Sequence, residues 1–533
     1  MWGVIESVSL EFIVTTLIGR NMPRSFYPLS AIILFMFVMG ARVSYRLGRF
    51  LKYESRLSRK DGRKNVMIIG AGDLGKSMAD EIHDSKYLDY NVCCFIDDGE
   101  AKKKRYISGV QVVGGRNAIV SSAEKYDIDI IMIAISNLQS QDRKELLSLC
   151  ETTGCEVRVL PPVYKIVDGT VTVNKMRKVN IMDLLGRDQR NISTERISEY
   201  IKGKVVLVTG GGGSIGSELC RQIASYKPKQ LIIFDIYENN AYDIQLELLN
   251  EYKDLNLVTL IGSVRNEHRV NDIFEQYHPD IVYHAAAHKH VPLMEQSPNE
   301  AIKNNVFGTW NVANAAIRYG TERFVLISTD KAVNPTNIMG ASKRLCEMIV
   351  QMLNGEGKTK FSAVRFGNVL ASNGSVVPLF EKQIERGGPV TVTHPDIVRF
   401  FMTIPEAVSL ILESGLLVGG GEIFVLDMGE PVKIDDMARK MIRLSGFVPD
   451  KDIKIEYTGL RPGEKMYEEI LMNEEGIRKT DSDRVYIGKA LEFDKDEFRK
   501  NLEELRSACM ADNESIKDIV ELIVPTYKRN ENG

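Results

Sequence analysis

The sequence predicts an α/β protein with two doubly wound, Rossmann-like parallel-sheet domains after an N-terminal membrane helix. Three observations support this fold class. An uncharged apolar stretch near the N-terminus is followed by basic residues, two runs of β-branched residues each lead into a glycine-rich turn, and further apolar strands follow each turn with helical segments between them. At roughly 150 residues per domain, the 533 residues have room for about three folded units.

Composition and charge exclude several classes of protein. Hydrophobic residues make up 44% of the chain, which is enough to fill folded cores and excludes a disordered or fibrous chain. With 69 basic and 72 acidic residues, the chain lacks the positive field with which nucleic-acid binders attract phosphates, so we expect no nucleic-acid partner. The seven cysteines and seven histidines show no zinc-ligand spacing, and we expect no metal.

Residues 1–60 are predicted to form a membrane anchor and a basic juxtamembrane segment. Residues 26–41 predict one clear helix, shorter than the ~20 residues that cross a bilayer, and residues 8–18 predict part of another. Seven basic residues lie between Arg42 and Lys60, so the positive-inside rule places the protein at the cell membrane with its large C-terminal part in the cytoplasm. The alternative is a buried helix of a soluble domain.

The first glycine-rich turn lies in a predicted Rossmann-like domain that covers residues 62–165. It has the spacing G-x-G-x-x-G after a β-type run, and the next predicted strand ends at Asp97 and Asp98, where a dinucleotide-binding fold has its ribose-binding carboxylate. Close packing of a helix on its strand also requires such glycines, and no catalytic side chains accompany them. The sequence therefore leaves ligand binding here open. The three glycines are Gly70, Gly72 and Gly75.

The second glycine-rich turn, T-G-x-x-G-x-x-G, is more specific. Gly210 permits the turn, Gly213 lets the backbone approach a pyrophosphate, and Gly216 lets the following helix pack on its strand. The next strand ends at Asp235, whose carboxylate can accept a hydrogen bond from an adenosine ribose 2′-hydroxyl and would repel a 2′-phosphate. NAD is therefore expected as the cofactor in preference to NADP.

This turn opens the predicted catalytic domain, residues 201–533, and residues 166–200, which lack long periodic runs, are predicted to be a linker arm before it. Later apolar runs complete a predicted parallel sheet of six or seven strands, with catalytic groups at the carboxyl ends of the strands. The runs are residues 257–261, 281–284 and 323–328.

Seven segments of the catalytic domain resemble, in their order, the extended short-chain dehydrogenase/reductase superfamily. They are TGGGGSIG, HAAAHKHVP, NNVFGT, STDKAVNPTNIMGASK, VRFGNV, HPDIVRFFM and GLRPGEK. Within this superfamily the chain resembles the membrane-anchored UDP-N-acetylglucosamine 4,6-dehydratases of polysaccharide synthesis. The resemblance covers nearly the whole chain and implies bound NAD, a UDP-N-acetylhexosamine substrate, a small C-terminal substrate-binding α/β subdomain and a homo-oligomer.

Three features depart from the superfamily or from the long members of the family. Met339 stands where the superfamily has the catalytic tyrosine of Y-x-x-x-K, although Lys343 is kept, and the long membrane-bound dehydratases share this change. Gly262 and Ser263 replace a Gly-Asp pair, so the expected carboxylate contact to adenine is in doubt. The long dehydratases usually have about four membrane helices, so the anchor here is shorter than theirs.

The resemblance also implies a reaction and roles for particular residues. The sugar is oxidised at C4 by transfer of a hydride to NAD, and the ketone makes the C5 proton acidic. Lys331 is implied as the base at C5, Asp330 as the acid that protonates O6, and Thr329 as a partner of the C4 hydroxyl. Because a base must be a neutral amine, we expect burial and Lys343 to lower the pKa of Lys331. The acceptor of the C4 hydroxyl proton is left open.

Two further sets of contacts follow from the resemblance. The implied cofactor contacts are Thr209, Gly210, Gly213, Ser214, Ile215, Gly216, Asp235, Ala285, Ala286 and Lys343. The implied substrate contacts are Asn368, Arg399, Arg461 and Glu464. The alternatives are a 5-epimerising dehydratase, a nucleotide-sugar 4-epimerase, and a membrane-tethered NAD-sensing or scaffold protein without turnover.

Overall fold

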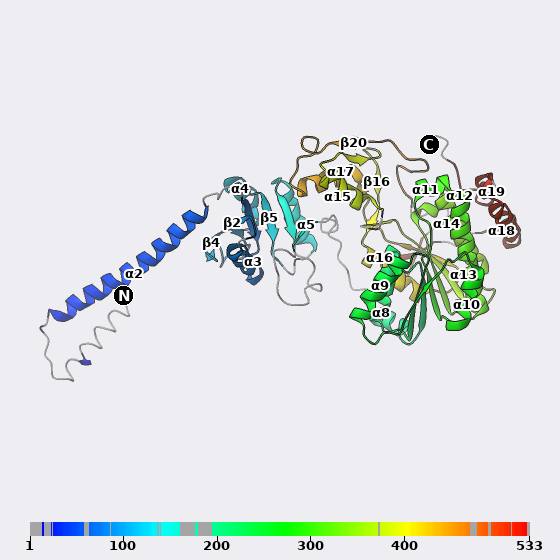
Figure 1. Cartoon of the computed structure of the whole chain (residues 1–533), viewed down its shortest axis with the longest axis horizontal. Coiled ribbons are helices and arrows are strands. Elements are labelled where there is room, and N and C mark those ends of the chain that lie inside the picture. Colours follow the sequence, from blue (N-terminus) through cyan, green and yellow to red (C-terminus); the bar gives the residue numbers. More distant parts are fainter. Residues whose placement is uncertain are drawn as a thin grey trace. The chain divides into compact units, whose positions relative to one another are not determined.

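The fold is taken from a computed structural model of the chain (Figure 1). It describes residues 13–14, 23, 25–57, 63–159, 176–179 and 194–529, apart from short gaps at 86, 136–137, 139, 371, 373, 470–476, 489–491 and 513. The chain divides into two compact units. The first comprises residues 1–179 and 443–447, and the second comprises residues 180–442 and 448–533.

The N-terminal helix α2 (Phe26–Leu57) presents apolar side chains to its surroundings. Its first 20 residues, Phe26–Tyr45, have a mean hydropathy of 1.8, and none of them is buried within the chain. Phe37, for example, is 80% exposed. The helix is therefore long and apolar enough to cross a membrane, and it is not a core helix of this chain.

This segment is longer than the predicted span of residues 26–41, because the helix continues past Arg42 without a break. A long basic side chain near the end of a membrane helix can extend its charged group toward the interface, so it need not end the span. The second predicted helix, residues 8–18, lies outside the described residues except for Ile13 and Val14.

The first unit contains an α/β sheet with a parallel centre. Its strands are ordered β3-β4-β2-β1-β5-β6-β7; the central pairs are parallel, and β3 and β7 add to the two edges in antiparallel orientation. A parallel centre requires crossover helices, and the chain supplies them between the strands. The strands are β1 (Lys64–Ile69), β2 (Tyr90–Ile96), β3 (Tyr106–Ile107), β4 (Val110–Gly114), β5 (Ile130–Ile133), β6 (Glu156–Val159) and β7 (Arg177–Lys178), and the helices are α3 (Asp73–Asp84), α4 (Ile119–Lys125) and α5 (Ser140–Glu151).

Two described elements fall within residues 166–200, the predicted linker arm. Strand β7 pairs with β6 of the first sheet, and helix α7 (Thr194–Ile201) buries Ile197 and Ile201 in the core of the second unit. Residues 166–175 and 180–193 of the predicted arm lie outside the described residues.

The second unit contains a larger sheet, for which nine strands are described, in the order β10-β9-β8-β11-β12-β13-β18-β22-β21. From β10 to β18 all pairs are parallel, as the sequence predicts for a doubly wound sheet. The antiparallel strands β22 and β21 were not predicted and extend one edge. The strands are β8 (Val205–Thr209), β9 (Gln230–Asp235), β10 (Leu257–Ile261), β11 (Ile281–His284), β12 (Arg323–Ile327), β13 (Lys360–Arg365), β18 (Glu422–Leu426), β21 (Ile477–Lys479) and β22 (Val485–Gly488).

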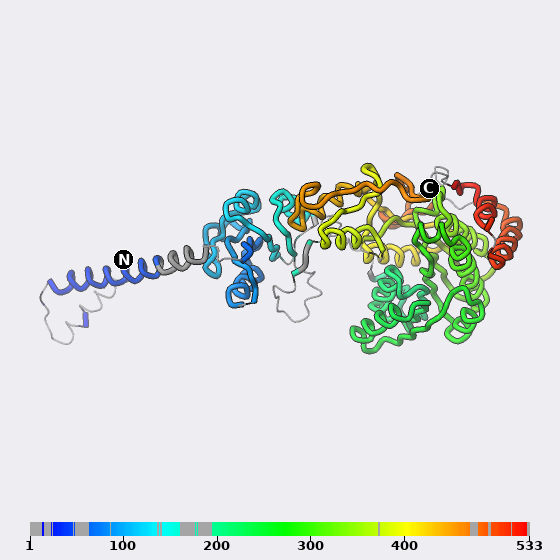
Figure 2. The backbone as a smooth tube through the Cα atoms, turned by 45° about the horizontal axis from the view of Figure 1, so that its top comes forward, coloured from blue at the N-terminus to red at the C-terminus, as the bar shows by residue number. Residues whose placement is uncertain are grey.

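Helices cover both faces of this sheet (Figure 1), and each face has its own apolar core. Helices α8, α9 and α16 pack on one face, and α10, α13 and α14 on the other. The C-terminal helices α18 and α19, red in Figure 2, pack beside the second group. Their bounds are α8 (Ser214–Ser225), α9 (Glu238–Glu251), α10 (Glu267–Tyr277), α13 (Gly308–Arg318), α14 (Ile338–Leu353), α16 (Ile404–Leu417), α18 (Lys495–Met510) and α19 (Ile516–Ile523).

A smaller α/β part of the second unit has a separate apolar core that includes Val377, Phe380 and Met437. Its strands pair in twos, β14 with β17, β15 with β20, and β16 with β19. The elements are β14 (Asn368–Val369), α15 (Val376–Glu385), β15 (Val390–Val392), β16 (Val398–Arg399), β17 (Phe401–Met402), β19 (Val432–Lys433), α17 (Ile434–Leu444) and β20 (Ile455–Tyr457).

Helix α14 is buried along its whole length, charged residues included, and a buried ion network holds it against the sheet. Glu347 of α14 accepts two hydrogen bonds from the Arg365 guanidinium of β13, at 2.7 Å each, and one from the Ser328 hydroxyl at 2.7 Å. Arg344 donates to the same carboxylate at 3.1 Å. This network sets the position of α14, which carries Met339 and Lys343.

Candidate active site

The main cavity of the second unit has a volume of about 670 Å³ and lies at the carboxyl ends of β8, β11 and β12. This is the edge at which open parallel sheets bind ligands. Both predicted groups of residues, from the glycine turn and from the STDK segment, line the same cavity. The predicted residues in its lining are Gly210, Gly213, Ser214, Ile215, Gly216, Ala285, Thr329, Lys331, Met339, Lys343, Asn368, Arg399, Arg461 and Glu464.

The glycine turn after β8 needs its glycines for steric reasons. Gly210 has φ +68°, and a Cβ there would lie 2.7 Å from the Ala286 nitrogen. A Cβ on Gly216 would overlap the Gly210 carbonyl oxygen. Gly213 is the N-cap of α8 and makes no side-chain cap, so the N-terminal backbone N–H groups of this helix face the cavity. The turn can therefore hold a pyrophosphate.

A smaller cavity of about 190 Å³ continues from this turn and suits the adenosine end of a dinucleotide. Asp235 lines it, and its two carboxylate oxygens accept the N–H groups of Gly212 and Tyr237, each at 2.8 Å. Ala286 and Ser263 also line it. Ser263 lies where the superfamily has a carboxylate, and its hydroxyl accepts the Arg265 N–H at 3.2 Å.

Thr209, a predicted cofactor contact, is fully buried behind the glycine turn and lines neither cavity. Its hydroxyl is 2.7 Å from Nδ1 of His284, whose Nε2 is 3.0 Å from the Thr309 hydroxyl. Burial, together with the nearby charge of Lys343, lowers the pKa of His284 to about 3. His284 is therefore neutral and links β8, β11 and α13 as a structural residue.

Thr329, Asp330 and Lys331 follow β12 and form a connected group. The Thr329 hydroxyl donates to Asp330 Oδ1 at 2.8 Å, and Lys331 Nζ donates to the same oxygen at 3.0 Å. The Asp330 side chain is fully buried and is not part of the cavity lining, whereas Thr329 and Lys331 are. Within the described residues, Asp330 Oδ2 has no hydrogen-bond partner. The Asp330 carboxylate is therefore connected to the cavity through its hydrogen bonds with Thr329 and Lys331.

Glu468 joins this group and was missed by sequence reasoning. Its Oε1 lies 3.5 Å from Lys331 Nζ and 3.8 Å from Arg399 Nε, and it lines the main cavity. The side chain is 4% exposed, and its Oε2 has no hydrogen-bond partner among the described residues. It follows the RPGEK motif as one of two adjacent glutamates, and nothing in the pattern separates it from Glu469.

The two lysines of the site have opposite pKa shifts. Burial lowers the pKa of Lys331, but the charges of Asp330 and Glu468 outweigh burial and raise it above its usual value. The expectation that burial and Lys343 would lower it is wrong, because Asp330 and, after it, Glu468 act against burial. Lys343 is 5% exposed, and burial lowers its pKa.

The four predicted substrate contacts differ in their surroundings. The Asn368 amide oxygen accepts from Lys331 Nζ at 3.4 Å. The Arg399 guanidinium is engaged by Glu464 at 3.1 Å and by the Lys465 carbonyl at 2.7 Å, so it holds the loop after the RPGEK motif. Arg461 is exposed and lines the cavity. Its side chain is therefore placed to meet an anionic ligand.

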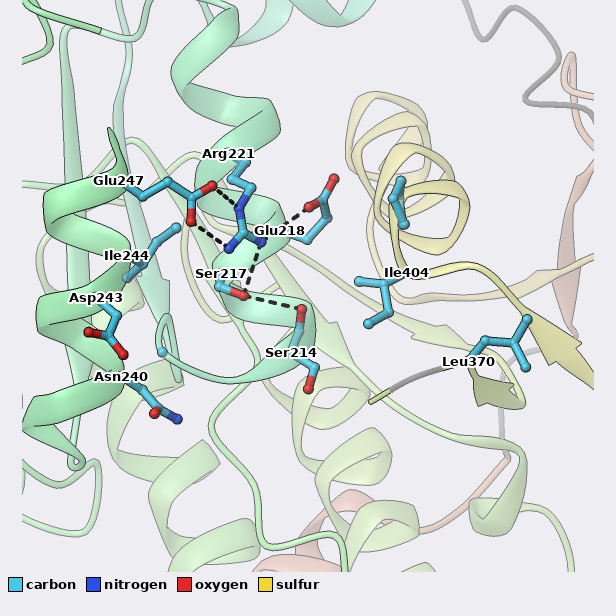
Figure 3. A pocket seen from close by; sticks show the side chains of 12 residues that line it. Ser214, Ser217, Glu218, Arg221, Asn240, Asp243, Ile244, Glu247, Leu370 and Ile404 are labelled. Carbon is cyan, nitrogen blue, oxygen red and sulfur yellow. Dashed lines mark hydrogen bonds and ion pairs between the residues drawn. The ribbon is translucent and has the colours of Figure 1, made fainter. Parts of the chain in front are cut away.

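A further hollow, of about 360 Å³, is lined by residues of α8 and α9 (Figure 3). Arg221 of α8 is bonded there to Glu247 of α9 at 2.7 and 2.9 Å, and to Glu218 and Ser217 of its own helix at 3.3 and 3.4 Å. These bonds tie α8 to α9 and so support the helix that begins at the glycine turn. The described residues of the chain contain no group of three histidines, cysteines or carboxylates arranged to hold a metal.

Comparison with known proteins agrees with this geometry. The family described as "Polysaccharide biosynthesis protein" matches residues 206–490, and one described as "CoA-binding domain" matches residues 1–161. The probable polysaccharide biosynthesis protein EpsC of Bacillus subtilis is 46% identical over 89% of this chain and 78% of its own length. The capsular polysaccharide biosynthesis protein CapD of Staphylococcus aureus is 42% identical over 95% of this chain and 85% of its own. A UDP-N-acetylglucosamine 4,6-dehydratase (inverting) of Campylobacter jejuni is 34% identical over 51% of this chain and 79% of its own.

The sheet, the glycine turn and the lysine-containing cavity define a nucleotide-sugar-modifying enzyme of the short-chain dehydrogenase/reductase type. The chain belongs to the polysaccharide biosynthesis protein family that includes EpsC and CapD, and it is related to the UDP-N-acetylglucosamine 4,6-dehydratases.

Proposed function

We propose that this chain is an NAD-dependent UDP-N-acetylglucosamine 4,6-dehydratase, a hydro-lyase that forms a UDP-4-keto-6-deoxy-N-acetylhexosamine for polysaccharide or glycan synthesis. The observation that carries the proposal is the bonded group Thr329, Asp330 and Lys331, of which Thr329 and Lys331 line the same cavity as the glycine turn. The named dehydratase relative supports the same reaction. In this proposal residues 201–533 are the catalytic domain.

The described residues fit NAD. The glycine turn of α8 would hold the pyrophosphate, Asp235 the adenosine ribose, Ala285 and Ala286 the wall beside it, and Lys343 the nicotinamide ribose. When bound, NAD takes a hydride from C4 of the sugar and later returns it to C6. Thr209 does not line the cofactor site. Its hydrogen bond with His284 helps to hold the strands behind the glycine turn in place.

The connected hydroxyl and carboxylate supply an acceptor for the C4 hydroxyl proton in the absence of a tyrosine. The C4 hydroxyl donates its proton to the Thr329 oxygen, which passes its own proton to Asp330 Oδ1, 2.8 Å away. Asp330 is then neutral, and the same hydroxyl returns the proton to O6 as water leaves. Asp330 thus ends the dehydration step as the carboxylate with which it began.

Lys331 must be neutral before it can remove the C5 proton, although its carboxylate neighbours keep it charged at rest. Glu468 Oε1, 3.5 Å from Nζ, is the acceptor of that proton. Lys331 then takes the C5 proton, returns it to C5 after the hydride has reached C6, and recovers its first proton from Glu468. All protons are therefore accounted for among these four residues, Thr329, Asp330, Lys331 and Glu468, the substrate and the water that leaves.

Replacement of Glu468 tests this step. Glu468→Gln keeps the size of the side chain but removes the proton acceptor, so we expect the rate of dehydration to fall by about 10²-fold. Single-turnover rates with UDP-N-acetylglucosamine, measured from pH 6 to 9, provide the readout. The matched control is Glu469→Gln, because Glu469 is exposed and bonds to Asn334 instead. Equal rates for the two variants would show that Glu468 has no part in the proton transfer.

Asp235 is predicted to select NAD. Asp235→Ala removes the carboxylate that would repel a 2′-phosphate, so we expect the preference for NAD over NADP to shrink by at least about tenfold. Dissociation constants for both cofactors, measured by calorimetry, test this, with the exposed Asp254→Ala as the control. Equal affinity of the unmodified protein for NAD and NADP would refute the role of Asp235.

We propose that helix α2 anchors the protein in the cell membrane and that the two sheets that follow it lie on the cytoplasmic side. Every residue of the proposed catalytic site lies after Lys204, and α2 is not part of its core. Removal of residues 1–60 should therefore leave a soluble enzyme with similar turnover. Fractionation without detergent and an activity assay of the truncated protein test this. A soluble full-length protein, or a folded but inactive truncation, would contradict the proposal.

Product analysis tests the whole function. Purified protein incubated with UDP-N-acetylglucosamine should give a new methyl doublet in the proton NMR spectrum as the C6 hydroxymethyl signal disappears. A 4-epimerase would keep the hydroxymethyl signal, a 5-epimerising dehydratase would give a methyl group with inverted C5 couplings, and a scaffold protein would give no product. Each of these three outcomes would replace the proposal.

A further inference from the structure

The first unit contains a cavity of about 420 Å³ that the proposed reaction does not use. It lies at the carboxyl ends of β1, β2 and β5, beside the glycine turn of α3. Its volume falls within the usual range for small-ligand sites, and the apolar side chains of Leu74, Ile96, Ile135, Leu138 and Leu146 line part of it.

The turn beside this cavity repeats the geometry of the cofactor turn in the second unit. Gly70 has φ +107°, and its N–H donates to the Ile96 carbonyl at 2.8 Å, just as Gly210 donates to Phe234 at 2.8 Å. A Cβ on Gly75 would overlap the Gly70 carbonyl oxygen, as one on Gly216 would overlap that of Gly210. Both turns are therefore compressed in the same way.

The acid at the end of the second strand is also held alike in the two units. Asp97 accepts the Ala71 N–H at 2.8 Å through Oδ2 and the Gly99 N–H at 2.9 Å through Oδ1. In the second unit, Asp235 accepts the N–H of Gly212, in the glycine turn, through Oδ2. It accepts the N–H of Tyr237, two residues after itself, through Oδ1. Close packing explains compressed glycines, but it does not require a carboxylate fixed at the ribose position of a cavity.

Charge distinguishes the first cavity from the second. Four carboxylates, those of Asp73, Asp97, Asp98 and Asp142, line it against two cations. Both cations are already paired, Lys102 with Asp97 at 3.0 Å and Arg116 with Asp98 at 2.9 Å. Such a lining disfavours a ligand with an additional phosphate near the ribose, since a phosphate monoester carries between one and two negative charges.

We propose that the first unit binds an adenosine diphosphate ligand whose ribose hydroxyls are free, of which NAD is the probe, and that it discriminates against CoA. The adenosine would lie in the apolar part of the cavity, its ribose hydroxyls at Asp97, and its diphosphate at the N-terminal end of α3. CoA has a phosphate on the ribose 3′-oxygen, which would face Asp97 and Asp98. The ligand class therefore differs from the one in the name of the family that matches residues 1–161.

Gly72 offers a variant that blocks the site without strain. It is the N-cap of α3 with φ −92°, and a Cβ there meets no atom within 4 Å, so Gly72→Val fits the fold and projects at the phosphate position. Ser77→Val, on the exposed side of the same helix and outside the cavity, is the matched control. Gly213→Val blocks the corresponding place in the second unit, where a Cβ would meet the Gly210 oxygen at 3.2 Å.

The test is the amount of NAD bound by the full chain in detergent, measured by equilibrium dialysis and by analysis of acid-released nucleotide. We expect two equivalents for the unmodified chain and for Ser77→Val, and one for Gly72→Val and for Gly213→Val. CoA should bind to Gly213→Val at least about tenfold more weakly than NAD. Binding of ADP as tight as that of NAD would also support the proposal and would identify the adenosine diphosphate part as the recognised group.

Other outcomes separate this inference from the proposed function. One equivalent of NAD that Gly213→Val loses and Gly72→Val keeps would overturn the inference and leave the cofactor of the dehydratase intact. One equivalent of NAD that Gly72→Val loses and Gly213→Val keeps would support the site in the first unit and contradict the cofactor site in the second. If Gly213→Val binds CoA as tightly as it binds NAD, the proposed discrimination against CoA is wrong.

Discussion

Lys331→Ala should abolish dehydration, with a loss of turnover on the order of 10³-fold or more, while NAD stays bound. Lys331 is the only described cation within hydrogen-bond distance of Asp330 Oδ1, and it lines the cavity beside Asn368. Its loss removes the base at C5 and leaves the buried Asp330 without its counter-ion. Methyl-doublet formation by NMR and nucleotide content after purification are the measurements.

Asp330→Asn should have an effect of similar size, because the amide cannot take the proton from Thr329 and return it to O6. It keeps the shape of the side chain, so the fold should be retained. Lys360→Ala, at the exposed start of β13, is the control for loss of a lysine. Near-normal turnover in either Lys331→Ala or Asp330→Asn would show that the role given to that residue is wrong.

Glu347→Ala should cause the largest loss of stability, about 3–5 kcal/mol. Glu347, Arg365 and Arg344 have side-chain exposures of 0%, 0% and 4%, so removal of the carboxylate leaves two guanidinium groups buried beside an unfilled space. Denaturant unfolding of the full chain, followed by fluorescence, measures this. Glu356→Ala, which removes an exposed pair with Arg499, should cost less than about 1 kcal/mol. Equal losses in the two variants would contradict the structural role of the network.

Glu347 should also make the free energy of unfolding depend on pH. Burial raises the pKa of Glu347, but Arg365, Arg344 and Ser328 outweigh burial and lower it to about 2. Because the folded pKa lies below the unfolded value of 4.5, the stabilisation is complete above pH 4.5 and is lost as the pH falls from 4.5 toward 2. The free energy of unfolding of Glu347→Gln should therefore fall less over this interval than that of the unmodified chain.

Local sequence was sufficient for the parts of the protein that depend on neighbours in the chain. Strand β8, the glycine turn and helix α8 follow one another directly in the chain, so the spacing of Gly210, Gly213 and Gly216 was enough to predict the turn. Asp235 and the group Thr329, Asp330 and Lys331 could be placed because they follow predicted strands, and carboxyl ends of parallel strands meet at one edge. The parallel order of the larger sheet follows from the same alternation of strands and helices.

Only the tertiary structure decided the features that depend on segments distant in the chain. Strand β22 pairs with β18, and β21 pairs with β22, although both follow the smaller α/β part in the chain, and no local periodicity predicts this addition. Glu468 also reaches Lys331 from a distant segment. Together with Asp330 it raises the pKa of Lys331, opposite to the expected direction, because a pKa responds to charges within a few ångströms in space. The sequence by itself therefore determined the turns and the positions of the proposed reacting residues after their strands, and the fold determined the charges that surround Lys331.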